Sequence, residues 1–111
     1  MANVDLADRT CRPLPEGTPA LSADDTARLL EELGNGWTVL EQRLRKAYTF
    51  PSFATALAFV NKVGAIADEQ DHHPDVMLSW GRAVVELWTH TVNGLSENDF
   101  ICAARFDRAN V

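Results

Sequence analysis

The sequence predicts an α+β fold in which three helices pack on one face of a four-stranded antiparallel sheet. Apolar residues recur at helical spacing in three segments and alternate with polar residues in four short segments. The links within each pair of short segments have room only for tight turns, so each pair is antiparallel. The predicted order is therefore helix, strand, strand, helix, strand, strand, helix. One sheet face and its edges stay uncovered, which favours a homo-oligomer.

Length and charge restrict the classes of protein to which this chain can belong. Its 111 residues suffice for one domain, and 46% hydrophobic and 23% charged residues are ordinary for a globular one. Sixteen acidic residues against ten basic ones give a net charge of −6, which disfavours nucleic acid as a partner. We expect no membrane span, because no run of about 18 apolar residues is present.

Compartment and domain organisation follow from the cysteines and the first residues. Cys11 and Cys102 form no CxxC pair, and the chain starts with neither a basic head nor an apolar stretch. We therefore expect a cytoplasmic location with reduced thiols. Three prolines and a glycine interrupt the start of the chain, which predicts an extended or mobile arm over residues 1–20. Residues 21–111 are expected to form a single domain.

Capping signals mark the first and last helices of that domain. Ser22 and Asp25 form a capping-box pattern ahead of a helix that two glycines end. Ser96 and Asp99 repeat the pattern ahead of a helix that runs to about Arg108.

The elements between these two helices are predicted from the alternation of apolar and polar residues and from the positions of the prolines. Strands are expected over residues 37–41 and 44–50, and Pro51 suits the first turn of the second helix. That helix must end ahead of Pro74, because a residue that precedes proline is pushed out of the helical region.

The three histidines of the chain are predicted to meet. Residues 75–80 and 83–90 alternate and pair as a hairpin around a glycine turn, with His72 and His73 just ahead of it and His90 at its end. Since both ends of a hairpin lie together, the three imidazoles converge. Imidazole gives or takes a proton near neutral pH, so such a cluster suits acid–base chemistry.

Rival explanations exist for each of these residues. Three imidazoles with Asp68 or Asp71 have the chemistry of a zinc site, although neighbouring side chains in an extended segment point apart. Asp99 has a structural explanation as the third residue of its capping box. Trp88 shares a strand face with His90, and it fits either the core or the wall of a site for a flat ligand.

These motifs together resemble those of the pterin-4a-carbinolamine dehydratase family. The resemblance covers about residues 20–108 and is carried by the following matches: Gly36-Trp37, Tyr48-Thr49-Phe50, His72-His73-Pro74, Thr89-His90 and Gly94-Leu95-Ser96-Glu97-Asn98-Asp99. It implies the fold described above, assembled as a homodimer or homotetramer.

The resemblance also implies an activity. The substrate would be a 4a-hydroxytetrahydropterin, which loses water to give quinonoid dihydropterin in tetrahydrobiopterin recycling, downstream of a pterin-dependent aromatic amino acid hydroxylase. No metal or organic cofactor is implied. His72 and His90 would be general acids. The residues implied to bind or support the substrate are His73, Pro74, Trp88 and Asp99. Asp68 stands where many members have glutamate, so its role stays open.

A non-catalytic function on the same fold is the alternative. Animal members of the family double as dimerisation cofactors of a homeodomain transcription factor, and some bacterial relatives are assembly factors for ribulose bisphosphate carboxylase. A pure scaffold has no need of three histidines, so their presence favours the enzyme.

Overall fold

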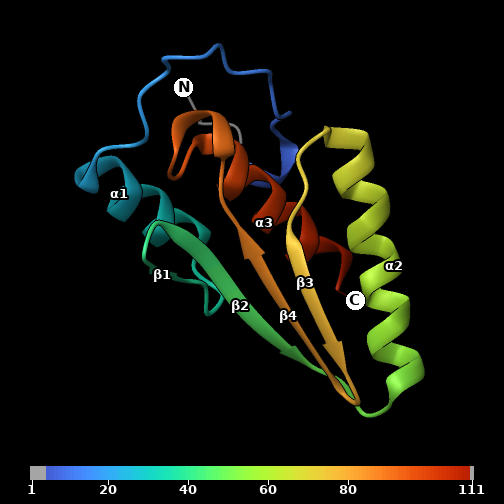
Figure 1. Cartoon of the computed structure of the whole chain (residues 1–111). Helices are drawn as coiled ribbons and strands as arrows, with labels where there is room; N and C mark the ends of the chain where they lie inside the picture. The colour runs from blue at the N-terminus through green and yellow to red at the C-terminus, as the bar shows by residue number, and fades with distance from the viewer. Residues whose placement is uncertain (1–4, 111) are drawn as a thin grey trace.

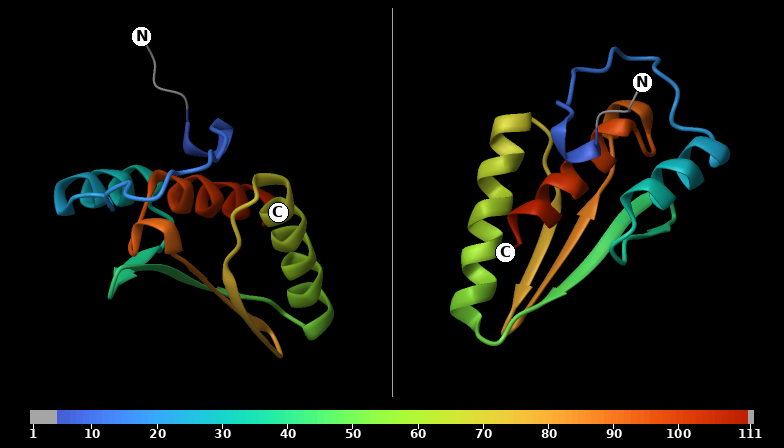
Figure 2. Two further views of the ribbon diagram at one scale, coloured as in Figure 1. Left: turned by 45° about the horizontal axis from the view of Figure 1, so that its top comes forward. Right: turned by 180° about the vertical axis from the view of Figure 1, so that it is seen from behind.

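The four strands form one antiparallel sheet in the order β1-β2-β4-β3, with the three long helices on one face (Figures 1 and 2). A computed structural model describes residues 5–110. Its elements are η1 (Leu6–Asp8), α1 (Ala23–Leu33), β1 (Thr38–Leu40), β2 (Arg43–Thr49), α2 (Phe53–Gln70), β3 (Asp75–Ser79), β4 (Arg82–Leu87), η2 (His90–Val92) and α3 (Glu97–Ala109). The predicted fold class and element order are confirmed.

Serine side chains begin the helices, because each satisfies a backbone N–H that the first turn leaves without a partner. Ser22 Oγ accepts from the N–H of Asp25 at 3.1 Å, and Ser52 Oγ accepts from that of Thr55 at 3.1 Å. Pro51 therefore lies just outside α2, and its predicted place in the first turn is wrong by two residues.

Helix α2 ends where the sequence predicts, in a turn that directs the next residues to the site. Asp71 caps the helix in the left-handed conformation, with φ 51° and ψ 43°. The N–H of His72 still bonds the carbonyl of Ala67 at 3.1 Å. The chain then turns into β3, so both loop histidines lie at the end of the sheet where α2 stops.

The core lies between the sheet and α3, which contacts both α1 and α2 (Figure 2). Side chains of β2 and β4 meet those of α3 in one buried cluster. Its largest fully buried members include Leu44, Leu87, Leu95, Phe100 and Phe106. Burying such side chains contributes about 1.5–3 kcal/mol each.

A partly buried ion pair accommodates Lys46, the one cation on the core-facing side of β2. Lys46 Nζ lies 2.8 Å from Oδ1 of Asp107, near the end of α3. The same carboxylate accepts from Trp37 Nε1 at 2.9 Å and from the hydroxyl of Tyr48 at 2.5 Å. Burial, together with this hydrogen bond and the nearby charge, raises the pKa of Tyr48. The carboxylate thus ties β2 to α3 through polar side chains.

Apart from η1, residues 5–20 of the predicted arm form no helix or strand, and residues 6–12 lie against α3. Leu6 of η1 is buried. Arg9 Nη1 lies 3.1 Å from Glu97 Oε1, and Arg105 donates to the carbonyl of Arg9. Asn98 exchanges two hydrogen bonds with the backbone of Arg12, at 2.8 and 3.2 Å. Residues 1–4 lie outside the described part of the chain.

Within the described residues, no helix has the length and apolar character that a membrane crossing requires.

Candidate functional site

A surface cleft of about 370 Å³ lies where α2 ends, β3 begins and β4 ends, and all three histidines line it. The other lining residues are Asp71, Pro74, Asp75, Trp88, Thr89 and Thr91. The convergence that the hairpin predicts is therefore observed. The chemical roles assigned to these residues stay predictions.

The innermost ring is that of His72, and a buried carboxylate holds it. Its Nε2 lies 2.6 Å from Oδ1 of Asp99, whose side chain has no exposed surface. The other carboxylate oxygen accepts from Thr89 Oγ1 at 2.8 Å and from the N–H of Ser96 at 3.0 Å. The two explanations offered for Asp99 therefore coexist, because one oxygen completes the capping box while the other orients His72.

The environment of His72 favours its charged form. Burial alone lowers the pKa of His72, but the hydrogen bond to Asp99 and the negative charge of that residue outweigh burial, and the pKa is raised. The ring thus carries a proton at a higher pH than a free imidazole does. Since Nε2 is committed to Asp99, Nδ1 is the ring nitrogen left for proton transfer.

His73 has a looser and more exposed arrangement. Its Nε2 lies 2.9 Å from Oδ1 of Asp68, and the two side chains are 57% and 84% exposed. Although aspartate is shorter than glutamate, Asp68 therefore reaches His73. Because water screens this pair, it contributes little to stability.

The position of His90 differs from the prediction. His90 was expected to end a strand, yet β4 ends at Leu87 and His90 begins η2. Thr89 and Gly94 exchange backbone hydrogen bonds, with N···O distances of 2.8 and 3.4 Å, and these close a loop that removes His90 from the sheet ladder. The ring of His90 nevertheless stays at the cleft.

The indole of Trp88 lies against the ring of His90, and both rings line the cleft. The rings of Trp88 and His90 have centroids 3.7 Å apart, so the predicted proximity of these two side chains is observed. The guanidinium carbon of Arg43 lies 4.2 Å from the centroid of the Trp88 ring, and Arg43 also pairs with Glu86 at 3.1 Å. Sequence reasoning missed Arg43; its only signal is the β2–β4 register, in which Leu44 lies opposite Leu87.

Metal ligation finds little support in the geometry. Among residues 5–110 there is no group of three or more His, Cys, Asp or Glu side chains arranged to hold a metal ion. The two loop histidines instead point their Nε2 atoms at different aspartates.

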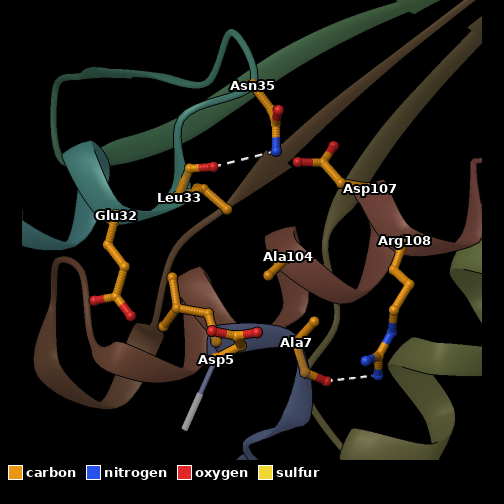
Figure 3. A pocket seen from close by; sticks show the side chains of 9 residues that line it. Asp5, Ala7, Glu32, Leu33, Asn35, Ala104, Asp107 and Arg108 are labelled. Atoms are coloured by element: carbon orange, nitrogen blue, oxygen red, sulfur yellow. Dashed lines mark hydrogen bonds between the residues drawn. The ribbon is translucent and has the colours of Figure 1, made fainter. Parts of the chain in front are cut away.

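A second cavity, of about 350 Å³, lies between η1 and the ends of α1 and α3 (Figure 3). No histidine lines it. Arg108 donates to the carbonyl of Ala7 at 2.7 Å, and Asn35 donates to that of Leu33 at 3.2 Å. Arg108 and Asn35 are thus engaged with the backbone of the fold, whereas the three histidines line the other cleft.

The chemistry of the cleft is that of proton transfer. The imidazole of His72, which Asp99 holds and whose pKa is raised, lines the cleft together with two more exposed imidazoles. The flat indole of Trp88 lines the same space. Such a site can protonate a leaving group and accept a proton elsewhere on a planar ligand.

Comparisons with known proteins show the family to which the chain belongs. The family model described as "Pterin 4 alpha carbinolamine dehydratase" matches residues 19–109. A curated protein of Nitrosomonas eutropha is 43% identical over 108 residues, which cover 96% of each chain. One of Rickettsia canadensis is 48% identical over 103 residues, which cover 92% of this chain and 94% of the relative. Both carry the name "Putative pterin-4-alpha-carbinolamine dehydratase".

Solved structures share the fold. A transcriptional coactivator/pterin dehydratase from Brucella melitensis superposes with a TM-score of 0.79 at 26% identity, covering 83% of this chain and 99% of that one. A pterin dehydratase-like protein, described as a RuBisCO assembly factor in the alpha-carboxysome, gives 0.59 at 23% identity, covering 70% and 93%. From its sequence and its fold, this chain belongs to the pterin-4-alpha-carbinolamine dehydratase family.

Proposed function

We propose that this protein is a hydro-lyase that removes water from 4a-hydroxytetrahydropterin to give quinonoid dihydropterin. The observation that carries the proposal is the cleft lined by three imidazoles, one of them braced by the buried Asp99. Membership of the family supports the substrate class. We extend the proposal to tetrahydrobiopterin recycling, which places a pterin-dependent aromatic amino acid hydroxylase upstream.

His72 and His90 are the proposed general acids. The C4a–O bond breaks as an imidazolium protonates the departing hydroxyl, which leaves as water. The proton on N5 is lost to a base, and its electron pair forms the new C4a=N5 double bond. Because hydroxide is a poor leaving group, a positioned acid accelerates this step by about 10²–10⁴-fold. The hydrogen bond to Asp99 and the charge of that residue raise the pKa of His72, which favours the protonated form that such an acid needs.

The remaining cleft residues are proposed to bind and orient the pterin. His73 lies at the mouth and can contact the polar edge of the ring, while Pro74 and Trp88 offer apolar surface for its faces. Asp99 acts through His72, which it orients and keeps charged. No metal and no organic cofactor takes part in the proposed reaction.

Stopped-flow measurement of 4a-hydroxytetrahydropterin dehydration tests the proposal. We expect purified protein to accelerate the reaction, and the double variant His72→Ala/His90→Ala to lose the acceleration while circular dichroism shows a folded chain. The matched control is His73→Ala, which should raise KM more than it lowers kcat. Wild-type rates in the double variant would refute the mechanism.

A protein-binding function is the second candidate, because large apolar side chains are exposed away from the cleft. Leu40, Met77 and Trp80 are 65, 68 and 72% exposed. We propose that these exposed side chains, on the two edge strands and the β3–β4 turn, serve assembly into a homodimer or homotetramer in the cytoplasm. If dehydration is absent while an assembly forms, the chain is instead a non-catalytic binding module; the similar Brucella melitensis protein is named as a transcriptional coactivator as well as a pterin dehydratase.

A further inference from the structure

Two thiols that are far apart in the sequence meet close to the backbone of His72. The Sγ atoms of Cys11 and Cys102 lie 3.6 Å apart although 91 positions separate them in sequence. Cys11 belongs to the extended N-terminal segment, and Cys102 lies in the middle of α3. Neither thiol takes part in the proposed dehydration. A disulfide has an S–S length of about 2.0 Å, so a small side-chain movement brings the two atoms to bonding distance.

The backbone around Cys11 is fixed, so the two thiols stay together in the folded chain. The N–H of Cys11 donates to Gln70 Oε1 at 2.8 Å. The next residue, Arg12, exchanges two hydrogen bonds with Asn98, one turn before Cys102 on α3. Holding two reactants in contact in this way removes most of the entropic cost of joining them.

The two thiols differ in access to solvent. Cys11 is half-buried and lines a surface cleft of about 260 Å³, together with Pro13, Glu69 and Gln70. Cys102 has no exposed surface. A small oxidant in solution therefore reaches Cys11 first.

The electrostatic environment favours the thiolate form at the more accessible thiol, Cys11. Donation from Cys102 lowers the pKa of Cys11, although burial opposes it, and the nearby His72 lowers it further. The same hydrogen bond, together with burial, raises the pKa of Cys102. Thiolates attack peroxides, whereas sheltered thiols do not.

We propose that Cys11 and Cys102 form a peroxide-reactive dithiol site that closes to an intramolecular disulfide. The Cys11 thiolate attacks a peroxide oxygen, the O–O bond breaks, and hydroxide leaves as a sulfenic acid forms. Cys102 Sγ then displaces the sulfenic oxygen, which departs as water with the Cys102 proton as the S–S bond forms. Two thiols and one hydrogen peroxide thus give one disulfide and two waters; both sulfurs are oxidised and the peroxide oxygens are reduced.

The disulfide would join the N-terminal segment to the helix that carries Asp99. Cys102 lies one helical turn beyond Asp99, and its Sγ is 3.8 Å from the carbonyl oxygen of His72. Closing so long a loop restricts the unfolded chain and raises the melting temperature. The site does not depend on the proposed dehydratase activity, and none of its tests uses that activity.

The direct experiment treats the full reduced chain with one equivalent of hydrogen peroxide and measures its intact mass. We expect a monomer lighter by two hydrogens, without free thiols, that yields one tryptic species joining the Cys11 and Cys102 peptides. Its melting temperature should rise by about 5 °C or more, and dithiothreitol should reverse every change. Two titratable thiols after treatment, or a disulfide-linked dimer, would overturn the proposal.

Single variants separate the roles of the two thiols. In Cys102→Ser we expect dimedone to trap a sulfenic acid at Cys11, and in Cys11→Ser we expect Cys102 to stay reduced at the same peroxide dose. Equal reactivity of Cys102 in the Cys11→Ser variant would contradict the assigned order. If either variant folds poorly, the intact mass of the peroxide-treated wild-type chain still shows whether the disulfide forms.

Discussion

Oδ1 of Asp99 lies 2.6 Å from Nε2 of His72, and 27 positions separate the two residues in sequence. The carboxylate is fully buried, and its second oxygen accepts from Thr89 and from the backbone of Ser96. A helix cap thus also orients the innermost histidine of the cleft. Protonation of His72 therefore depends on a residue in the first turn of α3.

Replacing Asp99 by Asn tests this relationship. The variant keeps an acceptor for the cap but loses the charge, so the pKa of His72 should fall and dehydration at neutral pH should drop by about 10²-fold or more. NMR titration of the His72 ring and the pH profile of kcat measure the two effects. Asp68→Asn, at an exposed pair, is the matched control and should change the rate less than about threefold. A normal His72 titration in Asp99→Asn would contradict the account.

The raised pKa of His72 predicts how stability depends on pH. A group whose pKa is raised by folding contributes its full stabilisation below its ordinary value of 6.5 and loses it as pH rises through the folded value. The difference in free energy of unfolding between wild type and His72→Gln should therefore be largest below pH 6.5 and shrink as the pH rises above that value. Urea unfolding at several pH values measures it. A difference that grows with pH would have the wrong sign.

Arg43 is predicted to support the indole of Trp88 at the cleft. Its guanidinium stacks on Trp88, an interaction of about 0.5–1 kcal/mol at a partly exposed site, and Trp88 in turn contacts His90. We expect Arg43→Met to raise KM severalfold, because the Trp88 indole loses the guanidinium that stacks on it. The value of kcat should stay within about twofold, because both proposed general acids remain. Arg45→Met, two residues along the same strand, is the control and should leave KM unchanged. A KM effect of equal size in both variants would count against stacking.

Asp107 is predicted to matter for stability and not for catalysis. Its carboxylate holds Lys46, Tyr48 and Trp37, and it is absent from the lining of the histidine cleft. Asp107→Asn should lower the free energy of unfolding by about 1–3 kcal/mol, because it leaves a half-buried ammonium without a counter-charge. Asp8→Asn, at the exposed pair with Arg108, should cost less than about 1 kcal/mol. Denaturant unfolding and kcat of folded protein distinguish the two effects.

Local signals predicted most of the fold. Ser22 and Ser96 begin helices through contacts with residues three positions away, so the helix boundaries can be read from short segments. The meeting of His72 with His90 followed from a hairpin, whose geometry is also local. The departure of His90 from the strand was missed, because strand alternation continues through His90 in the sequence while the Thr89–Gly94 bridge closes a loop there.

Contacts between distant segments account for the rest of what was missed. Asp107 with Lys46, Arg43 with Trp88, and Cys11 with Cys102 join elements that packing alone brings together. The spacing of residues within one segment does not predict any of these pairs. The N-terminal segment illustrates the point, since its prolines indicate an extended chain but not the α3 surface that it covers.

The central claim is that one cleft lined by His72, His73 and His90 takes a bicyclic pterin. NMR spectra that resolve the three imidazole rings, recorded while a stable dihydropterin is titrated into the full chain, test it most directly. We predict that all three rings shift along one saturation curve, and that Trp88→Leu weakens the binding. If the ring signals stay in place while residues of the exposed β3–β4 turn shift, the ligand binds elsewhere and the dehydratase proposal fails.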